Sequence, residues 1–209
     1  MNDPDYTALL LIIDRSGSMA RIRDDMVGGL TMMLAGQTAA PGRLTVDIVT
    51  FDDRIERQCS MADPASVTIS LEPRGMTALF DAIGTSVTEF GATLEALPEH
   101  ARPGIVQVVV VTDGYENSSR RFGAERIRAI VRHQTAECGW DFVFLGANQD
   151  AVLTGADLGF DAASSMTFEA DSLRVGAMHS SLGRYMGDVR QGAKRGFTRL
   201  ERAASSGTR

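Results

Sequence analysis

Three oxygen-bearing side chains occupy alternate positions in the segment Asp14-Arg15-Ser16-Gly17-Ser18. The segment directly follows an apolar run, residues 8–13, which is typical of a strand covered on both faces. One carboxylate and two hydroxyls at the end of a buried strand are hard oxygen ligands of the kind that Mg²⁺ needs. A second carboxylate, Asp113, follows another apolar run, residues 105–111. If the two strands are neighbours, we expect the two carboxylates to meet, where a cation between them would offset their repulsion.

Three kinds of enzyme site fit this loop poorly. A phosphate-binding turn uses glycines and exposed backbone N–H groups, and Asp14 would repel the phosphate. A phosphoryl-transfer loop with an aspartyl nucleophile usually has a second acid two residues on, where this chain has Ser16. A serine hydrolase needs a Gly-x-Ser-x-Gly frame, which neither Ser16 nor Ser18 has, and a histidine base. We expect the three histidines, His100, His133 and His179, at the surface or on helix faces.

Strand and helix patterns alternate along the chain. Strand patterns cover residues 44–51, 105–111 and 140–145, with a short one within 161–168, and helical patterns cover 22–34, 79–97, 124–137, 151–158 and 171–189. The alternating runs 55–59 and 67–71 predict a pair of short antiparallel edge strands. Thr77 is expected to cap the helix that follows it. Gly28 and Gly29 are expected to permit close approach of the first helix to the sheet.

These patterns predict an α/β fold. Its mostly parallel central sheet is doubly wound, with one antiparallel edge and helices on both faces. Ligands of such folds bind at the carboxyl ends of the strands, where the strand order reverses. We expect one domain over residues 6–190, followed by a basic tail, residues 191–209, that frays.

Composition excludes several other classes. The net charge of −6 argues against a nucleic-acid partner. Cys59 and Cys138 lie far apart without metal-type spacing, and we expect both thiols to be buried. The first residues are acidic where a signal peptide would be basic, and the apolar runs are too short to span a membrane. We therefore expect a cytoplasmic protein with no membrane partner.

Three elements in order resemble the metal-ion-dependent adhesion site (MIDAS) of von Willebrand factor type A (vWA) domains. The first is Asp14-x-Ser16-x-Ser18, the second is Thr77 within Gly75-Met76-Thr77-Ala78-Leu79, and the third is Asp113 within Thr112-Asp113-Gly114. The family often has Gly-Gly-Thr-Pro in the second loop, so Met76 and Ala78 are departures that keep the hydroxyl. Residues 140–150 resemble small stand-alone bacterial or phage-like members more than animal adhesion proteins.

The resemblance implies a Rossmann-like vWA domain that binds Mg²⁺ or Mn²⁺. Ser16 and Ser18 would bind the ion directly, and Thr77 would bind it directly or through water. Asp14 and Asp113 would act mostly through bound waters. An open coordination position would then take a carboxylate from a partner protein, which is binding and not turnover.

Two alternatives to this metal-bridged module stay open. A metal-dependent hydrolase in the same crevice would need Asp113 or Glu116 as its base. A metal-silent scaffold would contact its partners through the Arg-rich face of residues 120–132. Four further residues could line the rim of the site, and we expect them in ordinary turn roles: Asp52, Asp53, Glu116 and Asn117.

Overall fold

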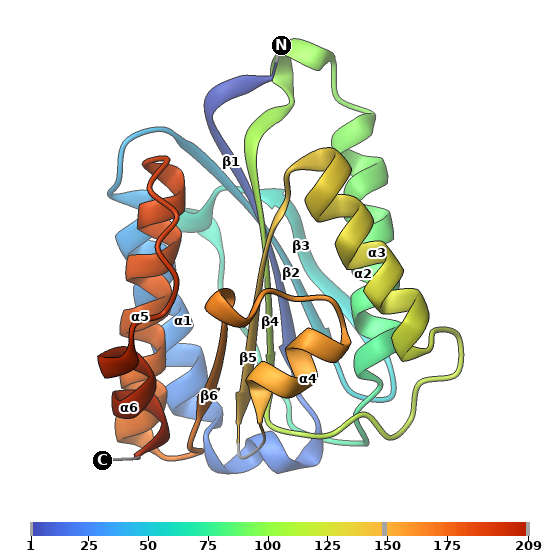
Figure 1. The fold of residues 1–209 in the computed structure, drawn as a ribbon, viewed down its shortest axis with the longest axis vertical. Helices are drawn as coiled ribbons and strands as arrows, with labels where there is room; N and C mark the ends of the chain where they lie inside the picture. Colours follow the sequence, from blue (N-terminus) through green and yellow to red (C-terminus); the bar gives the residue numbers. More distant parts are fainter. Residues whose placement is uncertain (1, 148–149, 208–209) are drawn as a thin grey trace.

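A single sheet organises the chain. The computed structural model describes residues 2–147 and 150–207, and its six strands have the order β3-β2-β1-β4-β5-β6 (Figure 1). They are β1 (Asp3–Asp14), β2 (Arg43–Phe51), β3 (Ile55–Ala62), β4 (Pro103–Thr112), β5 (Asp141–Ala147) and β6 (Ser165–Phe168). Only the pair β2–β3 is antiparallel among these described strands. The expected fold class, with a mostly parallel sheet and one antiparallel edge strand, is confirmed.

The strand order reverses beside β1. From β1 the chain proceeds to β2 and β3 on one side, then crosses over to β4 and β5 on the other. Ile13 lies opposite Val111 of β4, and Asp14 lies opposite Phe51 of β2. The carboxyl ends of β1 and β4 therefore adjoin at the switch point, which is where doubly wound folds bind ligands.

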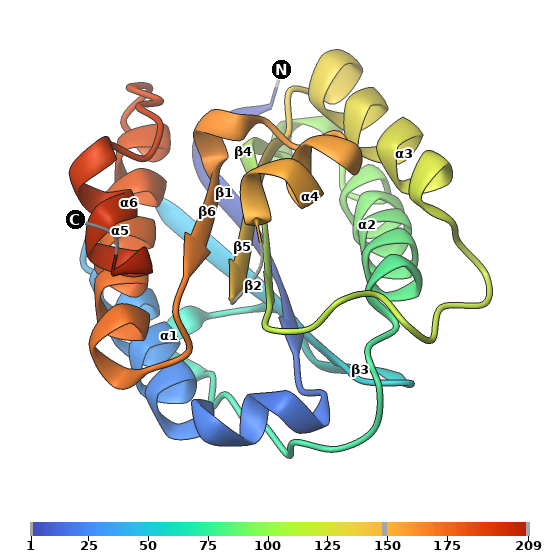
Figure 2. The same ribbon diagram turned by 60° about the horizontal axis from the view of Figure 1, so that its bottom comes forward.

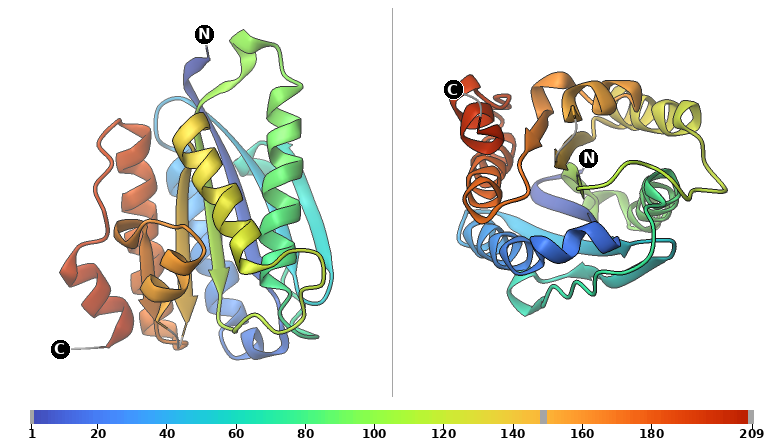
Figure 3. Two further views of the ribbon diagram at one scale, coloured as in Figure 1. Left: turned by 45° about the vertical axis from the view of Figure 1, so that its right-hand side comes forward. Right: turned by 90° about the horizontal axis from the view of Figure 1, so that it is seen from below.

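Helices cover both faces of the sheet (Figures 1 and 3). One face carries α1 (Arg23–Thr38) and α5 (Ser172–Arg190), with α6 (Arg199–Ser206) beside α5. The other carries α2 (Leu79–Glu95), α3 (Ala124–Cys138) and α4 (Ala151–Asp157). No helix of the described chain is both long and apolar enough to cross a membrane.

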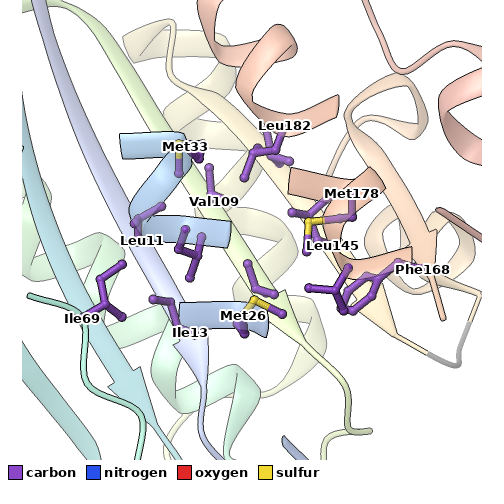
Figure 4. Packing of buried hydrophobic residues seen from close by; sticks show 14 of the residues in the cluster. Leu11, Ile13, Met26, Met33, Ile69, Val109, Leu145, Phe168, Met178 and Leu182 are labelled. Carbon is purple, nitrogen blue, oxygen red and sulfur yellow. The ribbon is translucent and has the colours of Figure 1, made fainter. Parts of the chain in front are cut away.

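The alternation of side chains along β1 divides the core in two. Leu9, Leu11 and Ile13 pack toward α1 and α5, whereas Leu10 and Ile12 pack toward α2 and α3. Figure 4 shows the first cluster, in which methionines of both helices meet the sheet. β1 is buried on both faces, and its last residue, Asp14, is buried as well.

The second edge strand predicted at residues 67–71 is wrong. Ile69 and Leu71 are buried, so the alternation does report packing. The segment is nevertheless outside the sheet. Its backbone hydrogen-bonds to a side chain of β3 and not to the backbone of that strand. Gln58 accepts a 3.1 Å hydrogen bond from the N–H of Ser70 and donates to the carbonyl of the same residue.

The expectation of a frayed tail is also wrong, because residues 197–206 are ordered. A capping box formed by Thr198 and Glu201 begins α6. The guanidinium of Arg184 donates two 2.7 Å hydrogen bonds to Glu201. Phe197 is buried, with its ring centroid 5.1 Å from that of Tyr185.

The C-terminal segment covers the free edge of β6. Every second residue along that edge makes a hydrogen bond with the segment: Ala163, Ser165, Thr167 and Glu169. The partners are the backbone of Phe197, the Arg202 guanidinium, and the hydroxyl and carbonyl of Ser205. An open strand edge attracts other strands, and here residues 197–205 take the place of a neighbouring strand.

Three further expectations are corrected. Cys59 is only partly buried and Cys138 is exposed, both as free thiols. His179 does lie on a helix, α5, but it is buried against α1 and not at the surface, whereas His100 and His133 are exposed. Gly29 makes room for the His179 ring and so serves helix–helix packing, not an approach to the sheet. A Cβ on Gly28 would meet open space.

Candidate metal site

All five predicted ligands lie at the switch-point edge of the sheet. Asp14 ends β1, and Ser16 and Ser18 follow it in the loop that leads into a short 3-10 helix, η1 (Gly17–Arg21). Thr77 lies just before α2, and Asp113 directly follows β4. Figure 2 brings this edge forward and shows the three loops side by side.

Asp14 is fully buried, and both its carboxylate oxygens accept hydrogen bonds. The N–H of Ser16 donates to Oδ1 and the hydroxyl of Thr112 donates to Oδ2, each at 2.6 Å. Burial raises the pKa of Asp14 to about 6, although these hydrogen bonds lower it. Within the described residues no lysine or arginine forms an ion pair with this carboxylate. A bound cation would relieve the cost of its burial.

A row of oxygens links the loop after β1 to the loop after β4. The hydroxyls of Ser16 and Ser18 are 3.1 Å apart. The Ser18 hydroxyl donates to Asp113 Oδ1 at 2.7 Å. Burial raises the pKa of Asp113, and the hydrogen bond from Ser18 lowers it. With Asp14 bound to the backbone of Ser16, four of the five residues form one continuous set.

Thr77 does not cap α2, contrary to the sequence prediction. The N-cap residue is Ala78, and it makes no side-chain capping bond. Asn117 holds the backbone of Thr77 on both sides: its Oδ1 accepts from the Thr77 N–H at 2.9 Å, and its own N–H donates to the Thr77 carbonyl at 3.0 Å. Asn117 thereby fixes the position of Thr77 at this edge of the sheet.

Gly114 keeps open the space between the second and third loops. A Cβ built on Gly114 would lie 2.7 Å from Thr77 Oγ1 and 3.6 Å from Asp14 Oδ2. The Thr77 hydroxyl and the Asp14 carboxylate therefore flank this glycine. A side chain at position 114 would occupy the space between them, which explains why glycine follows Asp113.

Side chains of the loop after β4 cap α2 in place of Thr77. Glu116 Oε2 accepts from the N–H of Phe80 at 2.9 Å, and the Ser119 hydroxyl accepts from the N–H of Asp81 at 3.0 Å. In return, Asp81 accepts from the backbone N–H groups of residues 120–122. Glu116 and Asn117 thus fasten two loops together, which is more than the turn roles expected of them. Nothing in the sequence around these residues signals this role.

A charge cluster with two buried and two exposed members anchors the first two loops. Arg15, the residue between Asp14 and Ser16, is 4% exposed. Its guanidinium lies 3.1 Å from Asp52 and donates to Glu56 at 2.6 Å. Arg74 contacts the same two acids at 2.9 and 2.7 Å, and its N–H donates to the Arg15 carbonyl.

This cluster keeps its acids ionised. The hydrogen bond from Arg15 lowers the pKa of Glu56 to about 2. Burial acts to raise the pKa of Asp52, but the bonds from Arg74 and from the N–H of Arg54 bring it below its usual value. Asp52, expected in a turn role, is instead the centre of the anchor. The sequence signal was an arginine inside the oxygen-rich loop, with an acid directly after β2 and another on β3.

The donor set suits a hard cation. It consists of two carboxylates and three hydroxyls. No cluster of three or more His, Cys, Asp or Glu side chains capable of holding a metal ion exists among the described residues. Oxygen ligands of this kind favour Mg²⁺ and Mn²⁺ over softer ions. The residues present therefore fit the ion that the sequence resemblance implied.

Comparison with known proteins identifies the fold. No family model and no curated protein matches the sequence. Proximal thread matrix protein 1 of the mussel byssus matches with a TM-score of 0.62 at 17% identity, over 87% of this chain and 46% of that one. A von Willebrand factor type A structure from Catenulispora acidiphila matches at 0.53 and 15%, over 86% and 42%. The chain has the vWA fold. The resemblance seen in the sequence is thus confirmed at the level of the fold.

One of the similar vWA structures carries a metal. A second structure of the mussel protein has a zinc-occupied MIDAS motif, and it matches with a TM-score of 0.57 at 18% identity, over 91% of this chain and 46% of that one. The present chain therefore spans less than half the length of the mussel protein. In this vWA fold, the candidate ligands lie at the switch point between β1 and β4.

Proposed function

We propose that the chain binds Mg²⁺ or Mn²⁺ through Asp14, Ser16, Ser18, Thr77 and Asp113. Through that ion it captures an acidic side chain of a partner protein. The observation that carries the proposal is the hydrogen-bonded row from Asp14 through the two serines to Asp113. Three of the five groups are neutral hydroxyls, and the two carboxylates would act mostly through bound waters, so the ion would stay electrophilic and attract a further carboxylate.

Binding is favoured over turnover by the hydrogen bonds of Glu116, one of the two candidate bases. Both oxygens of Glu116 are occupied: Oε1 accepts from the N–H groups of Ser118 and Ser119, and Oε2 accepts from Phe80 and from the Ser119 hydroxyl. A carboxylate that accepts four hydrogen bonds is a poor proton acceptor. We therefore propose a binding module and not an enzyme. Asp113 remains the one candidate base, so a screen of phosphate esters and peptides with Mg²⁺ or Mn²⁺ tests this part.

The metal site is tested by thermal unfolding with and without Mg²⁺, Mn²⁺ or Zn²⁺. An ion at 100 times its dissociation constant adds about 2.7 kcal/mol to the free energy of unfolding, which raises Tm by roughly 5–10 °C for a domain of this size. Asp14→Asn and Ser16→Ala should abolish the rise. Asp24→Asn is the control, because this carboxylate is 93% exposed on α1. A response to Mg²⁺ that survives Asp14→Asn would disprove the site.

The partner is tested by affinity capture on immobilised protein loaded with Mg²⁺. Proteins that bind through the ion should elute with EDTA and should not bind the Asp14→Asn column. Substitution of the partner's acidic residue by its amide should also abolish binding. Capture that persists in EDTA would instead support the metal-silent scaffold with its Arg-rich face at residues 120–132.

The same proposal includes a cytoplasmic location and no nucleic-acid partner. The free thiols of Cys59 and Cys138 suit a reducing compartment. The net charge of −6 would oppose binding to a polyanion.

A further inference from the structure

Beyond its first turn, which contains Arg23, Asp24 and Asp25, the outer face of α1 carries no charge. Residues 26–42 contain no Asp, Glu, Lys or Arg, although such residues make up 23% of the chain. The exposed positions of this stretch are small or apolar, and they include Gly28, Thr31, Met32, Ala35 and Gly36. A helix that faces only water normally has charged residues on its outer side. This face of α1 therefore has the composition of a contact surface.

The adjoining side of α5 continues this surface. A row at intervals of three and four residues consists of Leu173, Gly176, Ser180, Gly183 and Gly187. Leu173 at one end of the row is 71% exposed. The two helices lie side by side on the same face of the sheet (Figures 1 and 3). Arg184 borders the row, but its charge is already paired with Glu201 and Asp188.

A groove of about 550 Å³ runs between the two helices. Glycines form much of its lining, with Gly29 and Gly36 on α1 and Gly176 and Gly183 on α5. A Cβ on Gly36 or on Gly176 would meet nothing within 4 Å. The groove is thus a hollow that the chain itself does not fill.

His179 lines this groove with unused hydrogen-bonding capacity. The residue is only 5% exposed, and among the described residues neither of its ring nitrogens has a hydrogen-bond partner of good geometry, although the Val175 carbonyl, one turn earlier on α5, lies near the ring. Buried polar groups are nearly always paired. An unpaired imidazole in a hollow points to a missing occupant that supplies a donor or acceptor.

A protruding side chain that could fill the groove of a second copy lies next to the groove. Met32 is 77% exposed and lines the same groove. A protruding side chain next to an unfilled hollow on one surface is self-complementary. A twofold axis brings each knob of such a surface to the hollow of the other copy.

We propose that the α1–α5 face binds a second copy of this chain in a twofold dimer. Met32 of each copy enters the glycine-lined groove of the other. A second copy brings the same uncharged stretch of α1, and Arg184, the charged residue of the groove, is already paired within its own copy. It also brings the hydroxyls of Thr31 and Ser180, which donate to carbonyls of their own helices and whose oxygens can still accept from the ring N–H of His179.

The area of the α1–α5 face sets the affinity expected for the dimer. α1 and α5 contain 16 and 19 residues, so they are about 24 and 28 Å long, and two adjacent helices are about 20 Å wide. Each copy then contributes roughly 500 Å², which is near the lower limit for a specific interface. The dimer should therefore be weak and depend on concentration. The metal edge stays open, since it lies at the end of the strands and not on this face (Figure 2).

Sedimentation velocity between about 1 µM and 1 mM tests the proposal. The wild type should shift from monomer to dimer across this range. Met32→Glu should remain monomeric, and so should Gly36→Leu, which fills the hollow without adding charge. Leu153→Glu is the matched control. Leu153 is 61% exposed on α4, on the other face of the sheet, so this variant should dimerise like the wild type. Circular dichroism would verify that each variant is folded.

Two results would overturn the dimer. One is a wild type that stays monomeric throughout the range, which would leave the face to a different partner. The other is a Met32→Glu variant that dimerises as well as Leu153→Glu does. The dimer should also persist in EDTA and in Asp14→Asn, so its failure and that of the metal site can be told apart.

Discussion

The hydroxyl of Thr112 donates a 2.6 Å hydrogen bond to Asp14 Oδ2, joining the ends of β4 and β1. The bond is buried, and it serves one of the two oxygens of a carboxylate that has no ion-pair partner in the described chain. Thr112 thus supports the candidate ligand Asp14 without being one of the proposed ligands itself.

Thr112→Val should lower the free energy of unfolding by about 1.5–3 kcal/mol, because a buried carboxylate loses a donor. Urea unfolding at neutral pH measures this loss. Thr85→Val is the control, since the Thr85 hydroxyl is buried without a partner and its removal should cost little. Equal losses in the two variants would mean that the bond to Asp14 contributes nothing to stability.

Gly114→Ala should abolish the stabilisation by Mg²⁺, because the added Cβ lies 2.7 Å from Thr77 Oγ1. Calorimetric titration of Mg²⁺ into the folded variant measures the effect. Gly123→Ala, at a glycine whose Cβ would meet nothing within 4 Å, should bind the ion like the wild type. Normal binding by Gly114→Ala would remove this glycine from the site.

Two adjacent glycines of α1 should respond oppositely to alanine. Gly28→Ala should raise the free energy of unfolding by about 0.5–1 kcal/mol, because a helix-interior glycine is replaced where there is room. Gly29→Ala should lower it by about 1–3 kcal/mol, because the new Cβ collides with the His179 ring. Thermal unfolding of the pair at low protein concentration checks both signs. A stabilising Gly29→Ala would show that the ring can move aside.

His179 should make the protein less stable in mild acid. Burial lowers its pKa from 6.5 to about 4, although the Val175 carbonyl and Asp25 of α1 raise it. Between these values the unfolded chain binds a proton that the folded chain does not, so stability is complete above pH 6.5 and falls toward pH 4. The contribution is at most about 3 kcal/mol.

Urea unfolding as a function of pH measures this contribution of His179 to the free energy of unfolding. His179→Leu should remove it, leaving a flatter profile than that of the wild type between pH 6.5 and 4. His133→Leu, at an exposed histidine of α3, should keep the wild-type slope. If both variants retain that slope, other groups cause the loss of stability in acid.

Local patterns were enough to predict most of the sheet and its helices. The apolar runs before Asp14 and Asp113 predicted two buried parallel strands, and the structure places them side by side. The convergence of the candidate ligands followed, since both strands end at the same edge. Alternation of apolar and polar residues does not reveal the hydrogen-bond partner of a segment. Residues 67–71 were therefore assigned to a strand, although their backbone bonds to the Gln58 side chain and not to a neighbouring strand.

The residues that hold the site were harder to predict than the candidate ligands. Asp52 and Glu116 act on loops that are distant in sequence, and a single acid in a turn carries no mark of such a partner. The tail was misjudged for a related reason. Its composition is basic and small, but Phe197 and Arg202 find buried or backbone partners that only the assembled fold provides.

The contacts along β6 bear on the solubility of the protein. Residues 197–205 hide a strand edge that would otherwise be open to pairing with any extended chain. A chain ending at Arg190 would lose this cover together with the ion pairs of Arg184 and Glu201. Such a shortened protein is expected to precipitate or form fibrils through the exposed edge. Residues 197–205 are thus expected to protect the fold from aggregation at the edge of the sheet opposite β3.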